Sequence, residues 1–158
     1  MSGARPSEAE LPAAGRRIAV IASRFNDVIV SALLTGALAT WRRHGGADRD
    51  LYVARVPGAF ELPVAARRLA VSGRYEAIVA LGCVIRGDTP HFEYVAGECA
   101  RGLQQVSCDT GIPVAFGVLT VNNLEQAQAR AGAGADNKGA EAMASALEMA
   151  HLMTRLPR

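Results

Sequence analysis

A short polar turn between two apolar segments carries the residues best suited to chemistry. Residues 84–91 are Val-Ile-Arg-Gly-Asp-Thr-Pro-His, so an apolar strand ends near a glycine and a histidine stands where the next helix should begin. Backbone amides at a helix start attract anions, and a histidine titrates near neutral pH. The turn could therefore hold a phosphate group while His91 moves protons.

Two residues of this turn have more than one interpretation. A lone histidine near a helix start is more often a capping or surface residue than a catalyst, but His44 and His151 lie outside every expected strand-end loop. Arg86 could bind the phosphate directly or form a structural ion pair. Asp88 would repel a phosphate, so it should offer its backbone amide and turn its carboxylate away.

The ends of other expected strands also present aromatic and polar side chains. Phe25 could stack on a flat ring and Asn26 could bind sugar hydroxyls, or Phe25 could staple the next helix while Asn26 or Asp27 caps it. The loop 57–61 (Pro-Gly-Ala-Phe-Glu) contains a glycine that permits close backbone approach and a glutamate that could accept hydroxyl groups or complement the helix dipole. Phe116, judged from its apolar strand alone, is a core residue.

The start of the last helix is the remaining candidate. Lys138 stands where a positive charge opposes the helix dipole, and this local conflict hints at a functional role. Glu141 also belongs to an ordinary polar helix face, opposite the apolar residues.

A framework of alternating strands and helices must position these loops. Apolar runs predict strands at 17–22, 51–56, 77–84 and 113–120. Helical spacing predicts a helix that ends near His44, followed by helices at about 60–72, 92–108, 124–131 and 137–155. No hairpin signal appears, so we expect a three-layer α/β/α sandwich around a four-stranded parallel, flavodoxin-like sheet. In such sheets ligands bind at the carboxyl ends of strands, where the candidate loops lie.

Composition limits the other possibilities. With 158 residues, half of them hydrophobic and 20% charged, we expect a single domain at 16–158 behind a flexible arm at 1–15. A net charge of +2 with scattered arginines does not favour nucleic-acid binding. We see no membrane span, no export signal, and no zinc or disulfide pattern among the three cysteines, so a cytoplasmic protein without a metal site is expected.

Several motifs in register resemble those of the lumazine synthases, which catalyse the penultimate step of riboflavin synthesis. They are Arg-Phe-Asn at 24–26, Pro-Gly-Ala-Phe-Glu at 57–61, the run 84–95, Phe-Gly-Val-Leu-Thr at 116–120, Arg-Ala-Gly at 130–132 and Asn-Lys-Gly at 137–139. Ala129 stands where many relatives carry a glutamate. The resemblance implies the condensation of 5-amino-6-(D-ribitylamino)uracil with 3,4-dihydroxy-2-butanone 4-phosphate, without a cofactor. The products are 6,7-dimethyl-8-ribityllumazine, phosphate and water.

The resemblance also assigns roles to residues. It implies that His91 is the acid–base residue and that Glu141 orients it. The phosphate would be bound by Gly87, Asp88, Thr89 and Arg130. The pyrimidine and the ribityl chain would be bound by Phe25, Asn26, Gly58, Ala59, Phe60, Glu61, Val84, Ile85, Phe116 and Lys138.

An assembly follows from the same resemblance. The family forms a homo-oligomeric ring of five with sites between adjacent subunits, and some members build an icosahedral shell that can house riboflavin synthase. The N-terminal arm would add to a neighbour's sheet. The alternatives are a non-catalytic flavin- or lumazine-binding paralogue, a shell protein, and a flavodoxin-like electron carrier. The carrier would need a phosphate loop rich in Ser and Thr, which residues 23–27 do not form.

Overall fold

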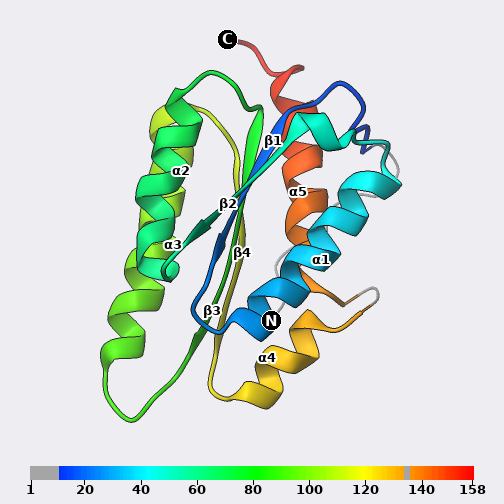
Figure 1. Ribbon diagram of the computed structural model, residues 1–158. Helices are drawn as coiled ribbons and strands as arrows, with labels where there is room; N and C mark the ends of the chain where they lie inside the picture. The colour runs from blue at the N-terminus through cyan, green and yellow to red at the C-terminus, as the bar shows by residue number, and fades with distance from the viewer. Residues whose placement is uncertain (1–10, 134–135) are drawn as a thin grey trace.

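A four-stranded parallel sheet stands between two layers of helices (Figure 1). The structure is a computed structural model that describes residues 11–133 and 136–158. The strands follow the order β2-β1-β3-β4, and their bounds are β1 (Ile18–Ser23), β2 (Leu51–Val56), β3 (Ala77–Ile85) and β4 (Val114–Val121). The predicted three-layer, flavodoxin-like architecture is confirmed.

The helices divide between the two faces of the sheet (Figure 1). One layer contains α2 (Leu62–Val71) and α3 (His91–Thr110), and the other contains α1 (Asp27–Arg43), α4 (Leu124–Ala131) and α5 (Lys138–Met153). Two short 3-10 helices, η2 (Asp48–Asp50) and η3 (Ala59–Glu61), precede β2 and α2. The expected helices are all present, with ends shifted by a few residues.

The central strands are apolar without alternation because both of their faces are buried. In β1, Val20 and Ala22 pack into the core with α1 and α5, whereas Ala19 and Ile21 pack into the core with α2 and α3. All six residues of β1 are buried. β1 and β3 therefore form a rigid base beneath the loops that follow them.

The outer strands are less covered within the described chain. β2 exposes Tyr52 and Val53, and β4 exposes Phe116. Each has a strand neighbour on one side only. Such edges are normally protected by charge, by a covering element or by another chain.

The packed part of the chain includes residues that we assigned to the N-terminal arm. Leu11 and Ala13 are buried in the core with α1, and the Ala13 amide donates to the His44 carbonyl oxygen at 3.1 Å. The boundary expected at residue 15 therefore differs from the structure. Residues 1–10, and residues 134–135 of the linker before α5, lie outside the described part.

Candidate active site

The loops after β1, β2 and β3 meet at the carboxyl edge of the sheet. We call residues 24–27, 57–61 and 84–91 the strand-end region. The amides of Arg24 and Phe25 donate to the carbonyl oxygens of Val56 and Pro57 at 2.8 and 3.1 Å. Asn26 Nδ2 donates to the Cys83 carbonyl oxygen at 2.9 Å. The structure thus brings together three of the loops singled out from the sequence.

Asn26 holds the first loop in shape. Its backbone is left-handed (φ 59°, ψ 48°), and it is the only non-glycine residue with positive φ in the part of the chain that the structure describes. Asparagine tolerates this conformation better than most residues do. Its side chain makes no capping hydrogen bond to α1, and Asp27 instead accepts from Arg55 at 2.5 Å. The interpretation of Asn26 as a side-chain cap is therefore wrong.

Phe25 projects from this loop toward solvent. Its side chain is 71% exposed, so it does not staple the start of α1. A rigid aromatic ring held outward by a fixed loop is suited to stacking on a flat ligand. The stacking role itself stays a prediction.

The loop 57–61 is closed by its own glutamate. Glu61 Oε2 accepts from the Gly58 amide at 3.0 Å, so the carboxylate serves the first turn of η3. Ala59 is buried beneath the loop, whereas Phe60 is exposed. The local role of Glu61 is established by this contact, and its role toward a ribityl chain stays a prediction.

The polar turn after β3 leads directly into α3. Gly87, Asp88 and Thr89 are exposed, and α3 begins at His91, itself exposed. The His91 amide donates to Thr89 Oγ1 at 3.4 Å. Val84 and Ile85 form the half-buried base of the turn. An exposed turn at a helix start can present amides to an anion, with His91 beside it for proton transfer.

Arg86 resolves one of the open alternatives. Its Nη1 lies 2.5 Å from Glu93 Oε1, and its Nε donates to Asn122 Oδ1 at 3.1 Å. Its guanidinium carbon lies 4.4 Å from the centre of the Phe92 ring. The structure therefore shows the ion pair that the sequence left as one of two possibilities.

The remaining candidates lie on other elements. We call Phe116 on β4, Arg130 on α4, and Lys138 and Glu141 on α5 the edge region. Phe116 is 48% exposed, so its interpretation as a core residue is wrong. The physical reason is that β4 is the outermost strand, a property that its apolar composition does not reveal.

The charged members of the edge region have partners within their own helices. Arg130 is exposed, and its Nη1 donates to the Gln126 carbonyl oxygen at 2.9 Å. Lys138 Nζ lies 2.8 Å from Glu141 Oε2. This acidic partner offsets the unfavourable place of a lysine at the start of α5.

A buried asparagine fixes the start of α5. Asn137 Nδ2 donates to the carbonyl oxygens of Ala131, Gly132 and Ala32, at 3.1–3.2 Å, while its Oδ1 caps the helix by accepting from the Ala140 amide at 3.0 Å. Sequence reasoning did not identify this role. The signal was present, because asparagine before a helical run is a common N-cap.

Gly139 allows α5 to approach α1 closely. A Cβ at Gly139 would lie 1.9 Å from the Leu33 carbonyl oxygen. Any larger residue would therefore push the helices apart. In the Asn-Lys-Gly motif, Asn137 and Gly139 fix the position of the start of α5, and Lys138 is the residue between them that is available for a functional role.

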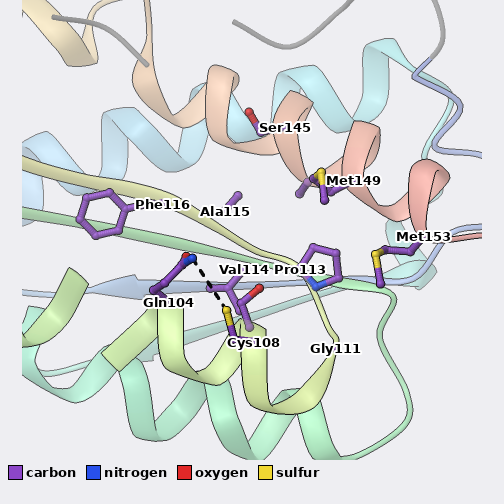
Figure 2. A pocket seen from close by; sticks show the side chains of 12 residues that line it. Gln104, Cys108, Gly111, Pro113, Val114, Ala115, Phe116, Ser145, Met149 and Met153 are labelled. Atoms are coloured by element: carbon purple, nitrogen blue, oxygen red, sulfur yellow. Dashed lines mark hydrogen bonds between the residues drawn. The ribbon is translucent and has the colours of Figure 1, made fainter. Parts of the chain in front are cut away.

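A groove of about 590 Å³ runs along the edge strand β4, between α3 and α5 (Figure 2). Figure 2 shows Phe116 at one end of the groove and Met153 toward the other. Gln104 and Cys108 of α3 line one wall, with 3.8 Å between Gln104 Nε2 and Cys108 Sγ. The groove is mostly apolar, and sequence reasoning did not find it.

Phe116 lies on a different strand from the loops of the strand-end region. Phe116 is paired with Ala80 of β3, which is paired with Ile21 of β1, so two strand spacings (about 10 Å) separate Phe116 from β1. His91 belongs to the helix layer on one face of the sheet and Glu141 to the layer on the other.

Other reactive groups are less suited to chemistry. Burial raises the pKa of the Cys83 and Cys99 thiols to about 11, so neither is a thiolate near neutral pH. None of the helices within residues 11–133 and 136–158 combines the length and the hydropathy of a membrane-spanning segment.

A comparison with protein-family models gives one match of high coverage. The model described as 6,7-dimethyl-8-ribityllumazine synthase matches residues 15–154. The match spans both the strand-end region and the edge region. It confirms the resemblance inferred from the motifs.

Proposed function

The chain belongs to the 6,7-dimethyl-8-ribityllumazine synthase family, and we propose that it condenses 5-amino-6-(D-ribitylamino)uracil with 3,4-dihydroxy-2-butanone 4-phosphate. The products are 6,7-dimethyl-8-ribityllumazine, phosphate and water. The observation that carries the proposal is the convergence of three loops around an exposed turn that ends at His91.

The strand-end region would bind the pyrimidine and the ribityl chain. Phe25 stacks on the ring, and the backbone of Gly58 and Ala59 meets its polar edge. Glu61 accepts from ribityl hydroxyls, while the remaining contacts come from Asn26, Phe60, Val84 and Ile85. The fixed loop geometry supports these roles, because a preorganised site loses little entropy when it binds.

The turn 87–89 would bind the phosphate with its backbone amides. Arg130 adds a planar guanidinium, which matches two phosphate oxygens at once. Asp88 contributes its amide only. Lys138, which is paired with Glu141 at 2.8 Å, would contact the pyrimidine and ribityl part, and Phe116 would cover the second face of the pyrimidine.

The reaction needs proton transfer at several steps. The 5-amino group attacks the ketone, and water leaves as the imine forms. Loss of a proton from the neighbouring carbon then expels phosphate, and the ribityl-bearing nitrogen closes the ring with loss of a second water. His91 shuttles these protons with Glu141 as its orienting carboxylate, while the orientation of the two substrates supplies most of the acceleration.

A second copy of the chain would complete each site. The exposed edge of β4 supports this proposal, and so do the two strand spacings between Phe116 and β1 and the placement of His91 and Glu141 in helix layers on opposite faces of the sheet. Following the family, we propose a cytoplasmic ring of five. A decamer and a shell of twelve rings, with riboflavin synthase as a guest, are further forms to examine by mass measurement.

A turnover assay tests the proposal. The purified protein is mixed with both substrates, and lumazine formation is followed against the uncatalysed background, with His91→Ala and Arg130→Ala beside the wild type. We expect acceleration that weakens in both variants. If the protein gives no acceleration but binds lumazines or flavins tightly, it is a binding paralogue instead.

A further inference from the structure

Arg86 is held by three side chains from two segments. Glu93 and Phe92 belong to the first turn of α3, and Asn122 follows β4. The Arg86 backbone also continues the β3–β4 ladder, because its amide donates to the Val121 carbonyl oxygen at 2.8 Å. One residue thus joins the ends of two strands to the start of a helix.

These contacts leave Arg86 poorly suited to bind phosphate. The Glu93 carboxylate already neutralises its charge at 2.5 Å, and the Phe92 ring covers one face of the guanidinium. A phosphate at Arg86 would have to displace Glu93 or lie beside it, and like charges at that distance repel.

The same contacts suit Arg86 to hold the turn. Residues 87–90 run between Arg86 and His91 without a regular element, and Arg86 clamps the helix at Phe92 and Glu93 on the far side of that turn. The clamp therefore sets where His91 stands relative to the amides of 87–89.

We propose that Arg86 is a positioning residue, which with Glu93 fixes the turn 87–90 and the first turn of α3 so that His91 faces the phosphate turn. The kinetic part of this inference rests on the proposed function. The structural part, that Arg86 orders residues 87–93, does not.

Removing the charge of Glu93 distinguishes the positioning role of Arg86 from direct phosphate binding by Arg86. If Arg86 bound phosphate, Glu93→Gln would free its guanidinium and phosphate would bind more tightly. If Arg86 positions the turn, Glu93→Gln should behave like Arg86→Met. Arg101 and Glu98 form an exposed ion pair elsewhere on α3 (3.7 Å), so Arg101→Met and Glu98→Gln are the matched controls.

The kinetic measurement compares kcat with KM for the butanone phosphate, and the inhibition constant of inorganic phosphate. We expect Arg86→Met and Glu93→Gln each to lower kcat about tenfold, because small misplacements of reacting groups are costly. The KM for the butanone phosphate and the inhibition constant of inorganic phosphate should each change less than about twofold. Arg86→Lys should recover part of kcat. Tighter phosphate binding in Glu93→Gln would overturn the proposal.

Hydrogen exchange tests the structural part without turnover. Exchange of amides in peptides covering 87–93 should rise in Arg86→Met and Glu93→Gln, with no change in α2 or α5, and neither control should differ from wild type. Unchanged exchange at 87–93 would overturn the proposal even if the enzyme is active. Raised exchange in a protein without turnover would keep the positioning role and reject the proposed reaction.

Discussion

The strand-end region and the edge region are built in opposite ways. In the strand-end region, loops from three strands hold one another through backbone and side-chain hydrogen bonds. In the edge region, Phe116, Arg130 and Lys138 stand on three different elements, and Phe116 and Arg130 are exposed. We infer that the strand-end region of one copy and the edge region of a neighbouring copy together form one site.

This difference shows how one chain can contain both sets of site residues while each site takes its two sets from two copies. The edge region has a firm frame, because Asn137 joins α1, α4 and α5 through hydrogen bonds. Phe116 and Arg130 are nevertheless exposed, and Phe116 lies at one end of the groove along β4 (Figure 2). A site shared between copies requires side chains that are held in place on the surface of one copy, where a second copy can contact them.

Removing Arg130 should give the largest effect on turnover. In the proposed site Arg130→Met would remove a bidentate, charge-assisted contact to phosphate, so kcat/KM for the butanone phosphate should fall about 10³-fold. Arg130→Lys should lie between Arg130→Met and the wild type, because it keeps the charge without the fork. Steady-state kinetics with the phosphate substrate varied would measure this. A fall below about fivefold would remove Arg130 from the site.

His91→Ala should have a smaller effect, in the other region. Turnover should fall about 10²-fold or less, since proton transfer contributes on that scale while orientation remains. Product affinity, measured by fluorescence titration, should stay within about threefold of the wild type, because the binding residues are untouched. Complete loss of activity with intact binding would contradict a mechanism dominated by orientation.

Asn137→Ala tests the frame of the edge region. The variant removes the donor for three carbonyl groups and the cap of α5, so the free energy of unfolding should fall by about 2 kcal/mol. Chemical denaturation would measure it, with Asn123→Ala, which removes the cap of the shorter helix α4, for comparison. Equal losses in the two variants would mean that the carbonyl contacts of Asn137 add nothing.

The smallest effect should be the pH dependence of the free energy of unfolding that Cys83, a buried residue beneath the strand-end region, contributes. Cys83, whose carbonyl holds Asn26, has a thiol pKa raised from 9.0 to about 11 by burial. The folded protein keeps this proton where the unfolded chain loses it, so the stabilisation is complete below pH 9 and disappears as pH rises through 11.

From pH 7 to pH 10, the wild type should lose about 1 kcal/mol more stability than Cys83→Ala. Denaturant titrations at the two pH values would measure the difference. Cys108→Ala, which removes an exposed thiol, should follow the wild-type curve. Parallel curves for wild type and Cys83→Ala would contradict the assigned cause.

Sequence patterns predicted the strands, the helices and the three loops that meet at the carboxyl edge of the sheet, whereas the roles of the site residues stay predictions. Continuous apolar runs located β1 and β3 because strands covered on two faces have no alternation. The exposure of Phe116 could not be predicted, since it depends on strand order. The contacts of Asn26 and Asn137 were also missed, because each joins residues that lie far apart in the sequence or depends on one backbone conformation. For Arg86 the sequence left an ion pair as one of two possibilities, and only the structure decides between them.

Mixing two variants with strongly reduced activity tests the central claim most directly. His91→Ala and Arg130→Met chains are co-refolded in equal amounts and assayed, with each variant refolded alone as the control. If each site takes one region from each of two copies, about a quarter of the sites should be intact, and activity should rise to about a quarter of the wild-type value. Activity no greater than the average of the two variants would mean that both regions serve a site within one chain, and would contradict this account.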